Sequence, residues 1–222
     1  MNWMKKVAVA LVCLLPLGLQ AAKVDTLQVK SPSMNKSIEV VVVSPDVAAT
    51  KACPVIYLLH GYGGNARTWV GIKPDLSKIA DEKGIFFVCP DGKNTWYWDS
   101  PLNADVRYET FISDELVKYV DSHYKTVADR KGRAITGLSM GGHGAMWNGL
   151  RHSDVFSAAG STSGGVDIRP FPKNWEMSVQ IGEKAKYPEN WEKYTVINLV
   201  PTLRKDQIAL IFDCGDSDFF WR

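Results

Sequence analysis

The segment Gly137-Leu138-Ser139-Met140-Gly141 places a serine between two glycines in the pattern G-x-S-x-G. It follows an apolar run that ends at Thr136 and precedes a segment with helical periodicity, so the serine stands at a strand-to-helix turn. Such a turn is tight, and small residues two positions before and after the serine let it close. The helix N-terminus then directs N–H groups at developing negative charge. The spacing predicts a nucleophile at Ser139 for acyl transfer.

A second glycine-rich stretch, Leu58-Leu59-His60-Gly61-Tyr62-Gly63-Gly64, continues an apolar run into a loop. Acyl transfer passes through a tetrahedral oxyanion that needs two preorganised N–H donors, one from the residue after the nucleophile and one from such a loop. We expect the backbone amides of Met140 and Tyr62 to form this oxyanion hole. Taken alone, the glycines are also compatible with a plain strand-to-helix turn.

The third candidate is Asp213-Cys214-Gly215-Asp216-Ser217-Asp218, where an apolar run ends in a loop with three carboxylates. A catalytic triad needs an acid that orients the histidine and stabilises its imidazolium. Spacing does not choose among Asp213, Asp216 and Asp218. A calcium loop is the competing interpretation, but the sequence does not extend it to the six or more ligands that calcium requires.

These loops need a scaffold, and the sequence predicts an α/β fold with a mostly parallel central sheet covered by helices on both faces. Residues 24–30 are typical of an edge strand and residues 38–43 of a β-branched one. We expect strands buried on both faces at residues 54–59, 85–89, 134–136, 156–159 and 208–212, and helices at 75–83, 108–124 and 140–150. Residues 170–204 break this rhythm and are expected to cover the carboxyl ends of the strands as helical lid material.

Composition and charge fit one globular domain. The 222 residues are 45% hydrophobic and 23% charged, with a formal net charge of +2. Residues 1–22 combine Lys5 and Lys6, the apolar run 7–19 and a small-residue end, so we expect a signal peptide followed by a domain at residues 23–222. A membrane anchor is the alternative, but the apolar run is short for a span. Without these lysines the charge is balanced, and nothing favours nucleic acid or a membrane surface as partner.

In combination, the motifs HGYGG, PDG with WYWDSP, RYETFI, GLSMGGHGA and DCGDSDFF resemble the esterase-D-type branch of the α/β-hydrolases. That branch includes S-formylglutathione hydrolases, feruloyl and acetyl-xylan esterases, and mycolyltransferases. The resemblance covers almost the whole chain after residue 22. It implies Ser139 as nucleophile, Tyr62 and Met140 as backbone oxyanion donors, and Asp218 as the triad acid.

The general base of this fold is a histidine that follows the acid in the chain, and only four residues follow Asp218. Of the four histidines present, we expect His60 to brace the oxyanion loop and His143 to face away from the serine. His123 and His152 are expected at the surface or at helix ends. We therefore expect the chain to be C-terminally incomplete, lacking the last helix, the last strand and the histidine. The strand at residues 208–212 would then have an uncovered edge and face.

The resulting expectation is a secreted or periplasmic serine carboxylester hydrolase that acts on small acyl esters, or on acyl or feruloyl groups of polysaccharide. We expect Trp98 and Gly164 to contact substrate. Water would resolve the acyl-enzyme, and this chemistry requires no metal and no organic cofactor. Two alternatives stay open, namely acyl transfer by the same fold, and a non-catalytic binding protein or inactive fragment without the triad histidine. The sequence does not predict an oligomeric state.

Overall fold

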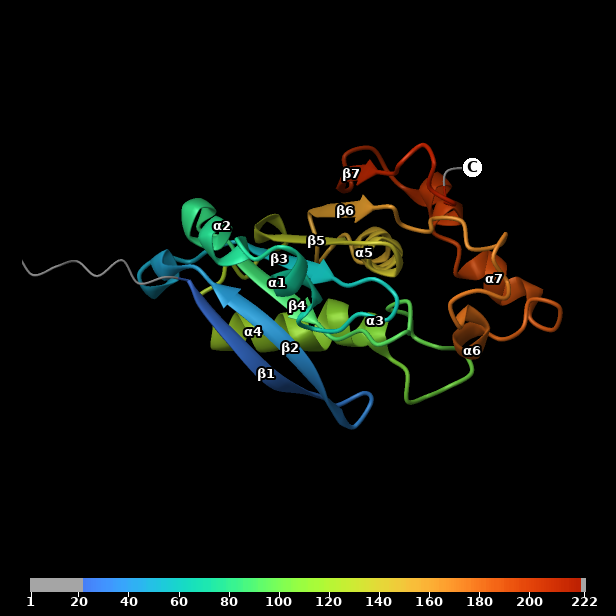
Figure 1. Ribbon diagram of the computed structural model, residues 1–222, viewed down its shortest axis with the longest axis horizontal. Coiled ribbons are helices and arrows are strands. Elements are labelled where there is room, and N and C mark those ends of the chain that lie inside the picture. Colours follow the sequence, from blue (N-terminus) through green and yellow to red (C-terminus); the bar gives the residue numbers. More distant parts are fainter. Residues whose placement is uncertain (1–21, 221–222) are drawn as a thin grey trace, which may run out of the picture.

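The computed structural model describes residues 22–220, and it shows one seven-stranded sheet flanked by helices (Figure 1). The predicted signal peptide lies outside the described residues except for Ala22. The strand order is β1-β2-β4-β3-β5-β6-β7. The strands are β1 (Lys23–Ser31), β2 (Lys36–Ser44), β3 (Val55–Leu59), β4 (Phe86–Pro90), β5 (Arg133–Gly137), β6 (Ala158–Thr162) and β7 (Ala209–Asp213).

The sheet is mostly parallel, as predicted. Strands β4, β3, β5, β6 and β7 pair in parallel, while β1 pairs antiparallel with β2 and β2 antiparallel with β4. Parallel neighbours carry their carboxyl ends to the same edge of the sheet, so the loops after β3, β5 and β6 meet there. Most predicted strand boundaries shift by one residue, and the largest shift is in β6, which begins at Ala158 and leaves the buried Phe156 in the segment before it.

Helices follow the strands at the predicted places. The helical elements are η1 (Asp46–Ala49), α1 (Thr68–Ile72), α2 (Leu76–Lys83), α3 (Tyr108–Thr110), η2 (Phe111–Glu115), α4 (Leu116–His123), η3 (Arg130–Gly132), α5 (Met140–Arg151), α6 (Met177–Ile181), α7 (Pro188–Lys193) and η4 (Val196–Thr202). The helix predicted over residues 108–124 is continuous, but its middle segment, η2, is a π-helix.

The core lies on both faces of the sheet, and β2 shows why. Its valines alternate, so that Val40 and Val42 pack in the larger cluster with α3 and α4, while Val41 and Val43 pack in a smaller cluster with α2. All four valines have no exposed surface. A strand apolar on both sides therefore requires helices on both sides, which is the layered arrangement seen in Figure 1.

Strand β7 is not buried on both faces, and its uncovered edge and face agree with the expectation stated for residues 208–212. It forms one edge of the sheet, and every residue from Ala209 to Asp213 is exposed. Ile211 is 77% exposed and Phe212 74%. These side chains have the residue types of a buried strand, so their exposure marks a part of the fold that is left open among residues 22–220.

Helices α6 and α7 lie at the end of the molecule toward which the arrows of β6 and β7 point (Figure 1). Residues 170–204 are therefore partly helical, with α6 and α7 near the carboxyl ends of the strands as predicted, while η4 packs along α5 instead. Within the described part of the chain, no helix combines the length and the apolar character that crossing a membrane requires.

Candidate active site

Ser139 sits on a strained turn between β5 and α5. Its φ of 55° and ψ of −117° lie outside the regions that non-glycine residues ordinarily occupy. The surroundings hold it there, because the Ser139 amide donates to the carbonyl of Thr162 at 2.9 Å and the Gly141 amide donates to the carbonyl of Leu138 at 2.8 Å. Strain of this kind persists only where neighbouring structure enforces it, and it clusters at functional sites. The predicted elbow is therefore present.

The glycines around Ser139 are required by close backbone packing. A β-carbon on Gly141 would lie 2.1 Å from the carbonyl oxygen of Leu59, and one on Gly137 would lie 2.3 Å from the carbonyl carbon of Gly141. Both distances are far below any real contact, so no side chain fits at either position. The first turn of α5 thus packs directly against the end of β3.

That packing brings the elbow to the glycine-rich loop. A β-carbon on Gly61 would lie 3.5 Å from Cβ of Ser139. The loop turns at once, since the Gly64 amide donates to the Gly61 carbonyl at 3.0 Å and Gly63 has a φ of 76°, as the third residue of a type II turn does. Tyr62 lies inside this turn. Met140 is the first residue of α5, and amides of a first helical turn have no partner within the helix.

His60 braces this loop, as expected. The ring is 1% exposed; Nδ1 donates to the carbonyl of Gly61 at 2.7 Å, and Nε2 accepts from the amide of Gly92 at 2.9 Å. The carbonyl of His60 accepts from the Tyr97 hydroxyl at 3.0 Å. Asp91 lies beside the ring. Burial pulls the pKa of Asp91 upward, but the Lys93 ammonium, 2.6 Å away, and the Lys93 amide outweigh it and hold the pKa at about 2.

His143, four residues after the serine, faces away from it. Its Nε2 accepts a 2.8 Å hydrogen bond from the indole of Trp98, and its Nδ1 donates to the carbonyl of Gly165 at 2.7 Å. Complete burial lowers the pKa of His143 to about 4, against which the Gly165 carbonyl acts only partly. The ring is therefore neutral at physiological pH, and both of its nitrogens are occupied.

The other two histidines lie on helices away from the elbow. His123 is exposed and stacks on Tyr119 with 4.0 Å between ring centroids. His152 is the C-cap residue of α5, as expected, and its Nε2 lies 2.8 Å from the buried carboxylate of Glu109, which also accepts from Arg151 and Trp147. It belongs to an ion cluster between α3 and α5. All four histidines are thus engaged outside a triad with Ser139.

Of the three candidate acids, Asp213 ends β7, while Asp216 and Asp218 lie in the loop that follows. Asp218 is half-buried, and its carboxylate accepts from the amide of Phe220 at 2.9 Å. Asp213 has an exposed side chain, and its carbonyl accepts from the Ser163 amide. Neither carboxylate has a histidine partner within residues 22–220. In that same range, no three His, Cys, Asp or Glu side chains gather in a way that could hold a metal ion.

The two predicted substrate contacts differ in outcome. Trp98 has no exposed surface and stacks on Trp96 and against His143, so it belongs to the core, and the expected contact with substrate is not supported. The sequence around Trp96 and Trp98 carries no signal that tells whether their indoles lie in the core or line a cleft. Gly164 lies against α5, where a β-carbon would sit 2.2 Å from Oγ of Ser161, and it lines a cavity. Its contact with substrate stays a prediction.

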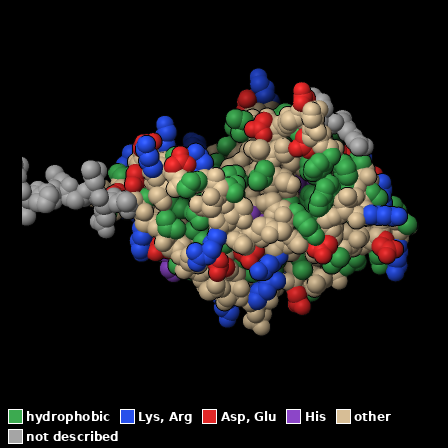
Figure 2. Space-filling view, viewed as in Figure 1, with side chains coloured by type: hydrophobic (Ala, Val, Ile, Leu, Met, Phe, Trp, Pro, Cys, Tyr) green, Lys and Arg blue, Asp and Glu red, His purple; other side chains and the backbone are tan. Residues whose placement is uncertain are grey.

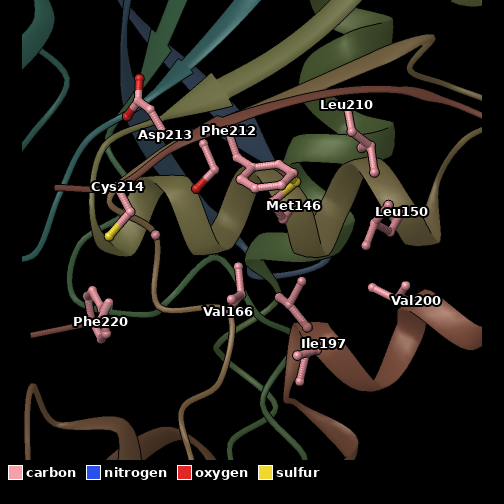
Figure 3. Close-up of a pocket in the computed structure, with 13 residues that line it drawn as sticks. Met146, Leu150, Val166, Ile197, Val200, Leu210, Phe212, Asp213, Cys214 and Phe220 are labelled. Atoms are coloured by element: carbon pink, nitrogen blue, oxygen red, sulfur yellow. The ribbon is translucent and has the colours of Figure 1, made fainter. Parts of the chain in front are cut away.

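This cavity, of about 490 Å³, runs along α5 (Figure 3). Met146 and Leu150 of α5 form one side, Leu210 and Phe212 of β7 lie across from them, and Figure 3 shows Ile197 and Val200 closing it from η4. Gly164, Asp213, Cys214 and Phe220 line the end nearest the elbow, but Ser139 itself is not in the lining. The cavity is apolar and continues the open face of β7.

Aromatic side chains gather next to the C-terminal loop. Trp175 stacks on Phe219 with 5.2 Å between ring centroids, and Phe220 contacts both Trp175 and Phe171 at 5.3 Å. Phe219 is 51% exposed. Figure 2 shows hydrophobic side chains gathered on this side of the molecule.

A parallel sheet with a strained serine between β5 and α5, facing a glycine loop after β3, defines an α/β-hydrolase fold with a nucleophile elbow. The Esterase family model matches residues 31–221, and the chain belongs to that family. Its resemblance to the esterase-D-type branch is confirmed.

Individual proteins agree with this assignment. An esterase of Mycobacterium tuberculosis is 31% identical over 149 residues, which are 64% of this chain and 32% of the relative. The chain thus spans about a third of that relative's length. A solved ferulic acid esterase is 29% identical with a TM-score of 0.71, over 90% of this chain and 81% of that one. The fluorophosphonate-binding serine hydrolase F of Staphylococcus aureus shares the fold at 21% identity and a TM-score of 0.76, over 91% and 82%.

Proposed function

We propose that this protein is a serine carboxylester hydrolase. Ser139 attacks the ester carbonyl, and the backbone amides of Tyr62 and Met140 bind the oxyanion of the tetrahedral intermediate. The alcohol leaves, and water hydrolyses the acyl-enzyme. No metal and no organic cofactor takes part in these steps.

One observation carries the proposal, namely that the strained Ser139 stands directly against the glycine loop that holds Tyr62. A serine kept at positive φ by backbone packing has a cost in stability that a plain turn would avoid. Ester hydrolysis uses this arrangement, since the nucleophile and two amides of different origin converge on one carbonyl group. The Esterase family and the ferulic acid esterase neighbour support the same reaction class.

The general base is the part of the triad that residues 22–220 do not supply. We propose that it lies in further sequence after Arg222, with Asp218 as the acid that orients it. The open face of β7 supports this, because α5 and η4, which precede β6 and β7, lie on one face of the sheet, and a further right-handed crossover from β7 would place its helix on the same face. The apolar cavity along α5 is there. Sequencing the gene in frame beyond the Arg222 codon tests this directly.

For the acyl group we propose an aromatic or small acyl ester, including feruloyl or acetyl groups on polysaccharide. The aromatic cluster of Phe171, Trp175, Phe219 and Phe220 supports the aromatic choice, since an exposed stack of rings favours a planar ring as ligand. The ferulic acid esterase neighbour is consistent with it.

Hydrolysis of methyl ferulate and of 4-nitrophenyl acetate tests both parts. Ser139→Ala should abolish turnover of the two esters. Trp175→Ala should lower kcat/KM for methyl ferulate about tenfold or more while changing the acetate less than threefold, because only the larger ring reaches the cluster. The matched control is Trp69→Ala, whose indole packs in the smaller core cluster on the far face of the sheet. Equal losses for both esters would contradict the aromatic acyl assignment.

Experiments on the same protein and on Ser139→Ala distinguish two other functions from ester hydrolysis. Acyl transfer is favoured if an added alcohol or sugar captures the acyl group in preference to water. A non-catalytic binding protein is favoured if Ser139→Ala changes neither turnover nor labelling by an active-site phosphonate.

We further propose export, with cleavage after residue 22, and N-terminal sequencing of the protein from the periplasm or medium tests it.

A further inference from the structure

The oxyanion loop rests on a second loop, residues 91–98, which the reaction itself does not use. Two contacts between these loops involve His60: its Nε2 accepts from the Gly92 amide, and its carbonyl accepts from the Tyr97 hydroxyl. A third contact comes from Asn94, and its Oδ1 accepts a 2.9 Å hydrogen bond from the amide of Gly63. Gly63 is the next residue after Tyr62, so Asn94 fixes the peptide adjoining the proposed oxyanion donor.

The same Asn94 side chain also reaches the segment that begins α6. Its Nδ2 donates to Oε2 of Glu176 at 3.2 Å. Beside it, the Trp96 indole donates to the carbonyl of Trp175 at 3.1 Å, so residues 175 and 176 both rest on the 91–98 loop. Glu176 has a φ of 54°, in the left-handed region that non-glycine residues seldom adopt.

Glu176 also influences the oxyanion loop electrostatically. Desolvation, and after it the nearby carboxylate of Glu176, raise the pKa of the Tyr62 phenol. The Gly61–Gly64 turn is held from this side by Asn94 at the backbone of Gly63, and Glu176 in turn binds the Asn94 side chain.

We propose that Asn94 is a positioning residue for the oxyanion hole, and that Glu176 fixes its orientation and so couples the α6 segment to the amide of Tyr62. This inference rests on the proposed function. The chemistry requires an amide at position 94, because one side chain must accept from Gly63 and donate to Glu176. A carboxylate there would accept but could not donate, and it would face the charge of Glu176.

This donor–acceptor logic gives a test by exchange. Asn94→Ala and Asn94→Asp should each lower kcat for 4-nitrophenyl acetate about tenfold with less than a twofold change in KM, since an oxyanion donor acts in the transition state. Glu176→Gln keeps an acceptor oxygen and should cost at most about twofold. In Asn94→Asp with Glu176→Gln the donor and acceptor are swapped, and activity should return to within about threefold of the unmodified protein.

The matched control is Asn103→Ala. Asn103 also accepts from a backbone amide, that of Asp105 at 2.9 Å, but in an exposed loop that does not touch the oxyanion loop. It should leave kcat unchanged. If Asn94→Ala and Asn94→Asp react like the unmodified protein, or if the double variant is no faster than Asn94→Asp alone, the proposal is overturned.

A second readout separates this inference from the proposed function. If Ser139→Ala shows that the unmodified protein has no serine-dependent turnover, the proposed function fails, and hydrogen exchange at the Gly63 amide then decides the bridge. Exchange at Gly63 should be at least tenfold faster in Asn94→Ala and restored in the double variant. Unchanged exchange at Gly63 would overturn the bridge whatever the activity.

Discussion

The indole N–H of Trp98 donates a 2.8 Å hydrogen bond to Nε2 of His143, and this contact takes the histidine nearest the nucleophile in sequence out of the reaction. The other ring nitrogen donates to the carbonyl of Gly165. Trp98 and His143 are both completely buried. A motif with a histidine four residues after the serine therefore carries a structural histidine, which joins α5 to the loops on either side.

Removing this ring should destabilise the fold. His143→Ala leaves a cavity and deprives the Trp98 indole and the Gly165 carbonyl of their partners, for a loss of about 3 kcal/mol in the free energy of unfolding. Urea unfolding measures it. His123→Ala, which removes an exposed ring, should cost less than about 0.5 kcal/mol. Equal losses in the two variants would contradict the structural role of His143.

The same ring predicts a pH dependence of stability. The pKa of His143 is lowered to about 4 in the folded protein from an ordinary value of 6.5, so between these pH values the unfolded chain binds a proton that the folded chain does not. Its contribution is complete above pH 6.5 and is lost as the pH falls toward 4, by about 3 kcal/mol in all. Denaturant unfolding at pH 7, 5.5 and 4.5 should show this loss, and His143→Ala should show a smaller one. Parallel pH profiles for both proteins would refute it.

A methyl group tests the elbow packing. Gly141→Ala places a β-carbon 2.1 Å from the Leu59 carbonyl and should prevent the turn from closing, with loss of Ser139 reactivity and at least about 3 kcal/mol of stability. Gly71→Ala is the control, because Gly71 lies in α1 with nothing within 4 Å of an added β-carbon, and it should be neutral or stabilising by up to about 1 kcal/mol. A thermal unfolding curve of Gly141→Ala that matches the unmodified protein would contradict the geometry.

Neutralising a buried carboxylate should lower the free energy of unfolding much more than neutralising an exposed one. Glu109 accepts from Trp147, Arg151 and His152, and although burial pulls its pKa upward, these partners lower it overall. Glu109→Gln removes the charge among them and should cost about 3 kcal/mol. Asp114→Asn removes an exposed i,i+4 pair with Lys118 and should cost about 0.5 kcal/mol or less. Chemical denaturation of both variants checks the difference, and the reverse order would show that the Glu109 cluster is not structural.

The sequence predicted those parts of the fold and site that depend on local pattern. Buried apolar runs marked the parallel strands, and glycine spacing marked the turn at Ser139 and the loop after β3, because only close backbone packing requires glycine at those positions. The role of His60 was also predictable, since a histidine directly before an oxyanion loop has backbone groups on both sides.

The side-chain positions and partners that could not be predicted from the sequence depend on long-range packing. Trp98 was expected at the cleft and lies in the core, because an indole serves either place and only the position of His143, 45 residues away, decides. His152 lies at a helix end, as expected, but its contact with Glu109, 43 residues away, could not be read from the sequence. Asn94 carries no motif, and its contacts to Gly63 and Glu176 exist only once three separate segments meet.

The role of Ser139 is tested most directly by its reaction with an alkyl fluorophosphonate, followed by intact mass and peptide mass spectrometry. We expect one adduct per chain, located on Ser139, and no adduct on Ser139→Ala under the same conditions. An adduct on another residue, or equal labelling of the two proteins, would contradict the assignment of Ser139 as the nucleophile.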